Sequence, residues 1–378
     1  MAFITGVGAT PFGRLEGSTA LGLMAQAADA ALADAGLARA QVDGLLCGYA
    51  TTLPHLMLST VFAEHYGLEP AYAHALQLGG ATGCAMAMLA RELVAVGRCR
   101  QVLVVAGENR LSGQTRDSAI QTLAQVGHPD YEVPFGATIP AYYALLASRY
   151  MHEHAVSEED LAEFAVLMRR HAGTHAGAHL KESITVADVL ASRTIAAPLK
   201  LLDCCPISDG AVALVVSAAP RDGGAVRIAG AGQAHLHQHV SSIASVSDLG
   251  ARRAARTALS EAGVGIDDID YLGIYDSFTI TLLILLEEIG IAPRAGAAAR
   301  LRAGDFGARG KLALNTHGGL LSYGHCGVAG GMAHLAEAQR QLAGRALARQ
   351  AGERRCALVH GDGGVLSSHV SLVLSSDG

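Results

Sequence analysis

The stretch ALADAGLARAQVDGLLCG at residues 31–48 decides the fold, because a second copy of it lies in the other half of the chain. Residues 258–275 read ALSEAGVGIDDIDYLGIY, and aligning the copies places Gly36 on Gly263. Each copy begins as an alanine-rich helix, reaches a glycine where a helix ends, and continues through an aspartate into a short apolar strand. The repeated order of these elements predicts an internal duplication.

A second unit also occurs twice. Residues 79–109 contain a glycine loop, a helix with an apolar stripe, a Gly-Arg stop and the strand QVLVVAGE, and residues 330–364 repeat that order. The unbroken apolar run in QVLVVAGE is typical of a strand buried on both faces. Alanine-rich composition by itself can also create such matches, and the repeated order makes that alternative weaker. Two β/α halves packed together would bring their glycine loops toward a shared centre.

Composition narrows the class of protein. The 378 residues are 51% hydrophobic and 16% charged, with a net charge of −6, which argues against a general nucleic-acid binder. Seven cysteines without a CxxC pair favour a reduced, cytoplasmic protein and no zinc site. The amino terminus shows no signal peptide, and the longest apolar run, around residues 280–286, is too short for a membrane span.

The region between the halves has a different character. Residues 110–200 are richer in His, Tyr and charge, and predict helices at 140–153 and 157–174. Ser157 and Asp160 resemble a helix cap at the start of the second helix. The next strand-like segment, GAVALVVSAA, would complete the sheet of the first half. We therefore expect four segments: the N-terminal half at 1–118, an inserted loop domain at 119–200, the completion of the first half at 201–225 and the C-terminal half at 226–378.

Three glycine-bracketed segments carry polar residues that a purely structural loop would not need. Gly79–Cys84 precedes a helix, where backbone N–H groups favour negative charge, although it also suits a tight turn. Residues 315–331, NTHGGLLSYGHCGVAGG, favour a functional site because of their side chains His317, Tyr323, His325 and Cys326. Residues 360–369 are either part of a site with His360 or a β-hairpin with an Asp-Gly turn.

Two further aspartates, Asp203 and Asp209, flank Cys204-Cys205-Pro206. We expect them to hold turns rather than to act as a catalytic pair of carboxylates.

These segments, in this order, resemble the thiolase superfamily, in particular its sterol-carrier-protein-like and acetyl-CoA-acetyltransferase-like branch. The motif NxxGGxxxxGH is matched by Asn315, Gly318, Gly319, Gly324 and His325. The resemblance covers essentially the whole chain. It implies an α/β fold, a five-layered αβαβα sandwich of two duplicated βαβαβαββ halves with an inserted loop domain. It also implies a homodimer or tetramer that takes an acyl-CoA thioester and needs no cofactor other than the coenzyme A of its substrate.

The departures from the family pattern concern its catalytic residues. Thiolases place a nucleophilic cysteine in a Cys-x-Ser/Thr-Gly turn, and that position falls on Gly80 here. Their second cysteine falls on Val359, beside His360, whose side chain would point to the opposite face of a strand. The asparagine of the family's N-E-A-F motif falls on Tyr275, and His325 is the catalytic residue that is kept.

A branch of the superfamily, the steroid side-chain aldolases, looks like this case, since it lacks the cysteine and uses tyrosines. By this resemblance the chain acts on an acyl-CoA at the Cα–Cβ bond, through retro-aldol chemistry and an enolate, without a covalent acyl-cysteine. We expect His325 and Tyr275 to share the proton transfers, with backbone N–H groups near Gly80 and Gly361 holding the oxyanion. We also expect the His325 imidazole to titrate near neutrality.

Two alternatives stay open. One is a thiolase-type acyltransferase in which Cys84, or Cys326, has become the nucleophile. The other is a non-catalytic subunit that binds acyl-CoA. Members of this branch often pair with a small OB-fold protein, so the resemblance implies such a partner, and it leaves the acyl group open.

Overall fold

The computed structural model describes residues 1–221 and 224–376. The elements of the first half are β1 (Phe3–Ala9), α1 (Ala20–Ala35), β2 (Gly44–Gly48), α2 (Leu58–Tyr66), β3 (Tyr72–Leu76), α3 (Thr82–Ala95), β4 (Gln101–Asn109) and β7 (Asp209–Ser217). Those of the second half are β8 (Val226–His235), α8 (Ala251–Ala262), β9 (Tyr271–Ile274), α9 (Thr279–Ile289), α10 (Ala297–Arg302), β10 (Ala313–Leu314), α11 (Val328–Leu342), β11 (Cys356–Gly363) and β12 (Ser368–Ser375).

Both halves build the same five-stranded sheet. The strand order is β3-β2-β4-β7-β1 in the first half and β10-β9-β11-β12-β8 in the second, so each strand has a counterpart at the same place. In each half the three outer strands are parallel and the last two are antiparallel to their neighbours. The sheets join where β1 meets β8, through Phe3 opposite Arg227 and Ile4 opposite Val226. The duplication expected from the repeat is confirmed.

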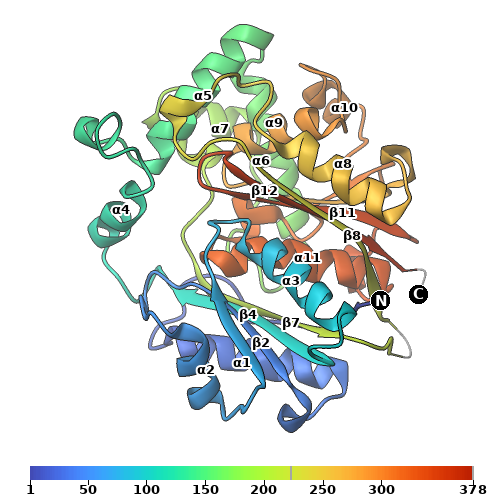
Figure 1. Cartoon of the computed structure of the whole chain (residues 1–378). Helices are drawn as coiled ribbons and strands as arrows, with labels where there is room; N and C mark the ends of the chain where they lie inside the picture. Colours follow the sequence, from blue (N-terminus) through green and yellow to red (C-terminus); the bar gives the residue numbers. More distant parts are fainter. Residues whose placement is uncertain (222–223, 377–378) are drawn as a thin grey trace.

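The helices form three layers around the two sheets (Figure 1). The middle layer consists of α3 and α11, which touch each other and strands of both sheets. Helix α1 covers the outer face of the first sheet, and α8 covers that of the second. The middle helices approach closely because α3 has a glycine where α11 packs against it: a Cβ at Gly83 would lie 2.6 Å from the Met332 side chain of α11. This is the expected αβαβα sandwich.

The inserted region lies between β4 and β7. It contains α4 (Arg116–Ala124), α5 (Ile139–His154), α6 (Glu158–Ala172), α7 (Val186–Ala191) and a small sheet of β5 (Thr194–Ala196) and β6 (Leu199–Lys200). The cap predicted at Ser157 is present, since its side chain accepts from the Asp160 N–H and Asp160 accepts from the Ser157 N–H. The expected segment boundary at residue 119 falls inside α4.

Candidate functional site

A tyrosine and a histidine from different segments meet at the carboxyl end of the second sheet. The Tyr275 hydroxyl lies 3.0 Å from His325 Nε2. Tyr275 directly follows β9, where the Asn315 side chain bonds both the N–H and the carbonyl of Ile274, at 2.8 and 2.7 Å. His325 follows a π-helical turn, and its own main-chain N–H donates to Pro206. Asn315 and His325, both part of the sequence motif, therefore position and complete the pair.

The hydrogen bonds of His325 define its tautomer. The Gly327 N–H, at the start of α11, donates to His325 Nδ1 at 3.2 Å, so in the neutral ring Nε2 carries the proton. Nε2 then donates to the Tyr275 oxygen, and the phenol proton is left to face a ligand. Burial and, after it, the Arg110 charge lower the pKa of His325 to about 3. The expectation that this ring titrates near neutrality is therefore wrong, because the surrounding protein disfavours the imidazolium.

The position of the thiolase nucleophile holds no side chain, and Tyr275 occupies the space beside it. A Cβ built on Gly80 would lie 2.3 Å from both the ring carbon Cζ and the hydroxyl of Tyr275, and 2.4 Å from the Asp362 carbonyl oxygen. Gly80 lies two residues before α3, whose N-cap residue Ala81 makes no side-chain hydrogen bond to the helix and whose amino end carries a partial positive charge. The arrangement therefore replaces a thiol by a phenol at the amino end of a helix.

A carboxyl group, Asp362, and a second phenol, Tyr143, lie close to Tyr275. Asp362, at the end of β11, is fully buried, and its Oδ2 accepts from the Tyr143 hydroxyl at 3.2 Å. Burial raises the pKa of Asp362 well above its usual value, because the buried site disfavours the charged carboxylate. Burial, with smaller contributions from Cys205 and Asp362, also raises the pKa of Tyr275 well above 10.

The two thiols considered as alternative nucleophiles are both buried. Burial raises the pKa of Cys84 to about 12 and that of Cys326 well above its usual value, so neither is a ready thiolate. Cys84 lies in the first turn of α3 against Gly361, and a backbone hydrogen bond from Gly361 partly offsets the effect of burial on its pKa. The Gly361 N–H, which the sequence predicts as an oxyanion donor, thus also lies close to the Cys84 sulfur.

The side chains of the secondary candidates make no direct contact with the Tyr275–His325 pair. His317 and Tyr323 are buried in a cluster of rings, with centroids 5.3 Å apart. His360 is a buried residue of β11; its ring bonds Ser371 at 2.7 Å and His369 at 3.1 Å, and its carbonyl accepts from the Tyr275 N–H at 3.0 Å. Within residues 1–221 and 224–376, none of the three side chains forms a hydrogen bond or ring contact with Tyr275 or His325.

The segment after His360 does form a hairpin, but Asp362 and Gly363 are the last residues of β11, and the turn falls at residues 364–367. The aspartates flanking Cys204-Cys205 hold backbone, as expected: Asp203 accepts from the Lys200 N–H, and Asp209 accepts from the N–H groups of Leu111, Ser112 and Leu15.

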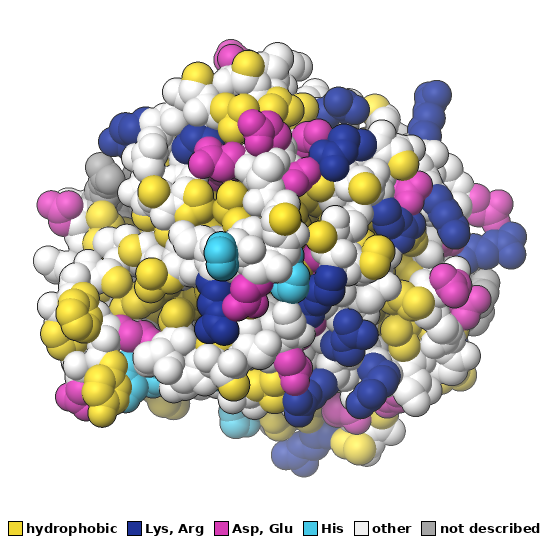
Figure 2. All heavy atoms as spheres, turned by 90° about the horizontal axis from the view of Figure 1, so that it is seen from above, with side chains coloured by type: hydrophobic (Ala, Val, Ile, Leu, Met, Phe, Trp, Pro, Cys, Tyr) yellow, Lys and Arg dark blue, Asp and Glu magenta, His cyan; other side chains and the backbone are white. Residues whose placement is uncertain are grey.

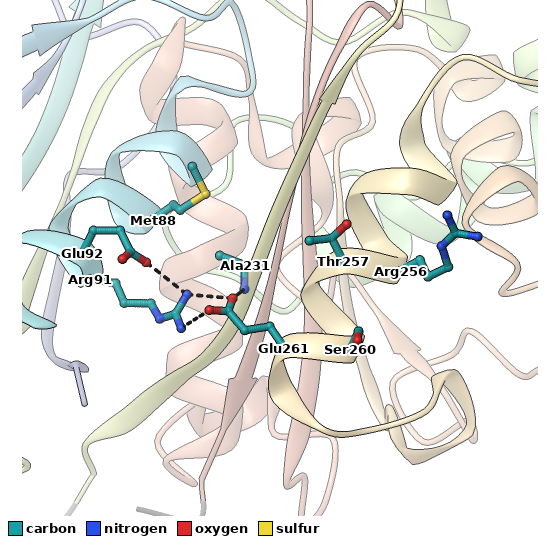
Figure 3. A pocket seen from close by; sticks show the side chains of 8 residues that line it. All are labelled: Met88, Arg91, Glu92, Ala231, Arg256, Thr257, Ser260 and Glu261. Atoms are coloured by element: carbon teal, nitrogen blue, oxygen red, sulfur yellow. Dashed lines mark hydrogen bonds and ion pairs between the residues drawn. The ribbon is translucent and has the colours of Figure 1, made fainter.

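A separate surface hollow of about 690 Å³ lies between α3 and α8 (Figure 3). Its main feature is an ion pair of Arg91 with Glu261 at 2.6 Å, and Glu261 also accepts from the Ala231 N–H of β8 at 2.7 Å. These contacts link the middle helix α3 to the outer helix α8 and give the Ala231 N–H of β8 an acceptor. Seen from above, acidic side chains are interspersed among the Lys and Arg side chains (Figure 2).

In the part of the chain that the structure describes, no group of three or more His, Cys, Asp or Glu side chains could hold a metal ion. No helix among these residues has the length and apolar character needed to cross a membrane. Cys47, Cys84, Cys99, Cys204, Cys205 and Cys326 are free thiols.

Three residues around Tyr275 were not singled out from the sequence. Arg110 directly follows the buried strand β4, and a polar residue at the carboxyl end of a parallel strand is a recognisable signal. Asp362 lay within a segment already considered, but the Asp-Gly pair indicated a turn. Tyr143 is one of several aromatics on α5, and nothing in the local pattern distinguishes it.

Comparisons with known proteins cover the whole fold. The thiolase N-terminal domain family matches residues 2–219, and the thiolase C-terminal domain-like family matches residues 232–376. A steroid side-chain-cleaving aldolase from Thermomonospora curvata is 33% identical over 100% of this chain and 98% of its own. A 17-hydroxy-3-oxo-4-pregnene-20-carboxyl-CoA lyase from Mycobacterium tuberculosis is 32% identical over 96% of each chain.

The solved structure of an Ltp2-ChsH2(DUF35) aldolase is similar along the full chain, with a TM-score of 0.85 and 33% identity, and the chain covers 98% of it. Two family matches that together span nearly every residue, a duplicated sheet, and relatives above 30% identity from end to end agree with one another. The protein belongs to the thiolase superfamily.

Proposed function

We propose that the protein cleaves the Cα–Cβ bond of a β-hydroxyacyl-CoA by a retro-aldol reaction, without an acyl-cysteine. The observation that carries this proposal is the Tyr275 hydroxyl, which lies against Gly80 and is hydrogen-bonded to His325. A Claisen thiolase needs a nucleophilic cysteine, which carries the acyl group, at the position that Gly80 occupies here. In this protein the Tyr275 hydroxyl, a group that can transfer protons, fills the space beside Gly80. The names of the aldolase and lyase relatives support the same class of reaction.

In the proposed reaction the Tyr275 oxygen carries out both proton transfers. In its phenolate form Tyr275 takes the proton of the substrate's β-hydroxyl, the β-carbon becomes a carbonyl, and the Cα–Cβ electron pair moves into the thioester as an enolate. The resulting phenol returns the proton to Cα, which leaves a ketone or aldehyde and a shortened acyl-CoA. Nε2–H of His325 stabilises the phenolate by a hydrogen bond throughout, and the lowered pKa of the ring keeps the imidazole neutral.

The enolate oxygen needs hydrogen-bond donors. Gly80 lies two residues before α3, and the dipole of that helix favours developing negative charge at its amino end. We assign the oxyanion site to the backbone at Gly80 and not to Gly361, whose N–H is directed at Cys84.

The assembly is part of the proposal. The similar aldolase structure bears the name of a second component with a DUF35 domain, so we propose that this chain also works with a small partner protein. We further propose a homodimer or tetramer in the cytoplasm, with coenzyme A entering only as part of the substrate. A monomer in light scattering at micromolar concentration would contradict the dimer.

The decisive experiment uses a panel of β-hydroxyacyl-CoA esters, assayed with and without any small partner protein that is encoded nearby. His325→Ala should lower turnover by about two to four orders of magnitude, the range for one acid–base group or oxyanion donor. Tyr275→Phe keeps the ring, removes the hydroxyl and should cause a comparable loss. Acyl-CoA affinity should change far less in both variants.

Each outcome discriminates between the functions considered. If wild type binds acyl-CoA but cleaves no member of the panel under any condition, the chain is a binding subunit. If an acyl group from acetyl-CoA is found by peptide mass on Cys84 or Cys326, the protein is an acyltransferase. If both variants cleave as fast as wild type, the Tyr275–His325 site is wrong.

A further inference from the structure

Arg110 carries a buried charge without a partner. It directly follows β4, and only 6% of its surface is exposed. Its Nε and one terminal nitrogen are inaccessible to solvent and have no hydrogen-bond partner among residues 1–221 and 224–376. A buried charge costs several kcal/mol unless an opposite charge or hydrogen bonds compensate it. The guanidinium is therefore positioned for an anion that the resting protein does not supply.

Two carboxylates lie near Arg110 along the chain and across the sheet, and other groups bind them. Glu108, two residues earlier, accepts through Oε2 from the N–H groups of Thr51 and Thr52 at 2.7 and 3.1 Å, while its buried Oε1 has no hydrogen-bond partner among the described residues. Asp209, which pairs with Asn109 across the sheet, accepts from the N–H groups of Leu15, Leu111 and Ser112. In the part of the chain that the structure describes, neither carboxylate lies within ion-pair distance of Arg110.

The fold places Arg110 beside the reacting pair. The short segment 206–209 links the two parts of the chain that carry Arg110 and His325. Its Asp209 pairs with Asn109, which directly precedes Arg110, and its Ile207 pairs with His325. Burial is the main cause of the shifted pKa values of both rings; the positive charge of Arg110 partly offsets the rise for Tyr275 and adds to the fall for His325, as expected for a cation close to both.

We propose that Arg110 is the charge that stabilises the phenolate of Tyr275 during the cleavage. This inference rests on the function proposed above. The β-hydroxyl proton can move to Tyr275 only when that oxygen is anionic, yet burial and Asp362 both oppose its ionisation. His325 supplies a hydrogen bond but no charge. A fixed, unpaired guanidinium in a site shielded from water supplies the missing electrostatic stabilisation and needs no rearrangement during the reaction.

The kinetic test is a double-mutant cycle. Arg110→Met should lower kcat by about a hundredfold or more with little change in KM, and Arg110→Lys, which keeps the charge, should recover at least a tenth of the wild-type rate. In the Tyr275→Phe background Arg110→Met should cost less than threefold, since residues that act through one another are not additive. Equal losses in both backgrounds would overturn the inference.

A control separates charge from folding. Arg169 is also buried, but its guanidinium donates to Ser322 and to the Glu182 carbonyl. Arg169→Met removes an equally buried guanidinium and should leave the turnover of the folded fraction within a few-fold of wild type. If Arg169→Met lowers kcat as much as Arg110→Met, the effect of Arg110 is structural and the inference fails.

A second measurement does not depend on turnover. A fluorinated tyrosine with an acidified phenol, incorporated at position 275, can be titrated by its fluorine NMR shift. Arg110→Met should raise the pKa of this phenol by at least about one unit, and Arg110→Lys should raise it less. An unchanged pKa would refute the role of Arg110 even if the enzyme is active. A raised pKa in a protein that cleaves nothing would leave the electrostatic assignment standing and refute the retro-aldol function instead.

Discussion

Replacement of Gly80 by alanine tests the central feature of the site, the close approach of Tyr275 to the backbone of the nucleophile's position. The new Cβ would lie 2.3 Å from the Tyr275 hydroxyl, whereas an ordinary contact starts at 3.4 Å. The tyrosine must therefore retreat by about 1 Å. The Asp362 carbonyl, at 2.4 Å, belongs to strand β11 and cannot yield in its place. A displacement of about 1 Å at a reacting group costs about a hundredfold in rate.

We therefore expect Gly80→Ala to lower kcat for β-hydroxyacyl-CoA cleavage by about a hundredfold, with a loss of about 1–3 kcal/mol in unfolding free energy from the overlap. Steady-state kinetics and urea unfolding measure the two effects. Gly97→Ala is the matched control, because φ is +72° there and nothing lies within 4 Å of the new Cβ. It should cost about 1 kcal/mol from backbone strain and leave kcat unchanged. A folded Gly80→Ala variant with wild-type kcat would refute the reasoning.

Three further predictions follow from the burial of the site and the core. Cys84→Ala should keep turnover within a few-fold, because the thiol is buried and its pKa is about 12; loss of all activity in a folded variant would identify Cys84 as the nucleophile. The unfolding free energy should fall as the pH drops from 6.5 toward 4, because burial lowers the pKa of His171 and His369 to about 4 and the unfolded chain takes up protons first. Each can contribute up to about 1.4 kcal/mol per pH unit in urea titrations, and a curve without slope there would contradict the assignment. Gly80→Cys alone should form no covalent adduct with acetyl-CoA, whereas combining it with Tyr275→Asn should open the space and allow one, detectable by peptide mass; an adduct on the single variant would disprove the steric argument.

The duplicated halves could be predicted because each element leaves a local signature. The glycine that ends α1 recurs at the end of α8, and in both halves a short apolar strand follows. The cap at Ser157 and the glycine-rich motif around His325 are equally local, since they depend on hydrogen bonds between neighbours in the chain. Backbone hydrogen bonding and burial act within a few residues, and a single sequence records them.

The chemistry of the site depended on contacts between residues far apart in the chain. Gly80 and Tyr275 come from different halves, and only the packing of the two sheets against α3 and α11 brings the phenol over the glycine. The same packing half-buries His325 and lowers its pKa from the ordinary value near 6.5 to about 3, which residue type alone does not indicate. The sequence by itself determined the repeated order of helices and strands and the residue types at the motif positions. The tertiary structure decided which of these side chains share a site, how far they are buried and which charge, Arg110, lies unpaired beside them, because burial and electrostatic interactions depend on distances in space and not along the chain.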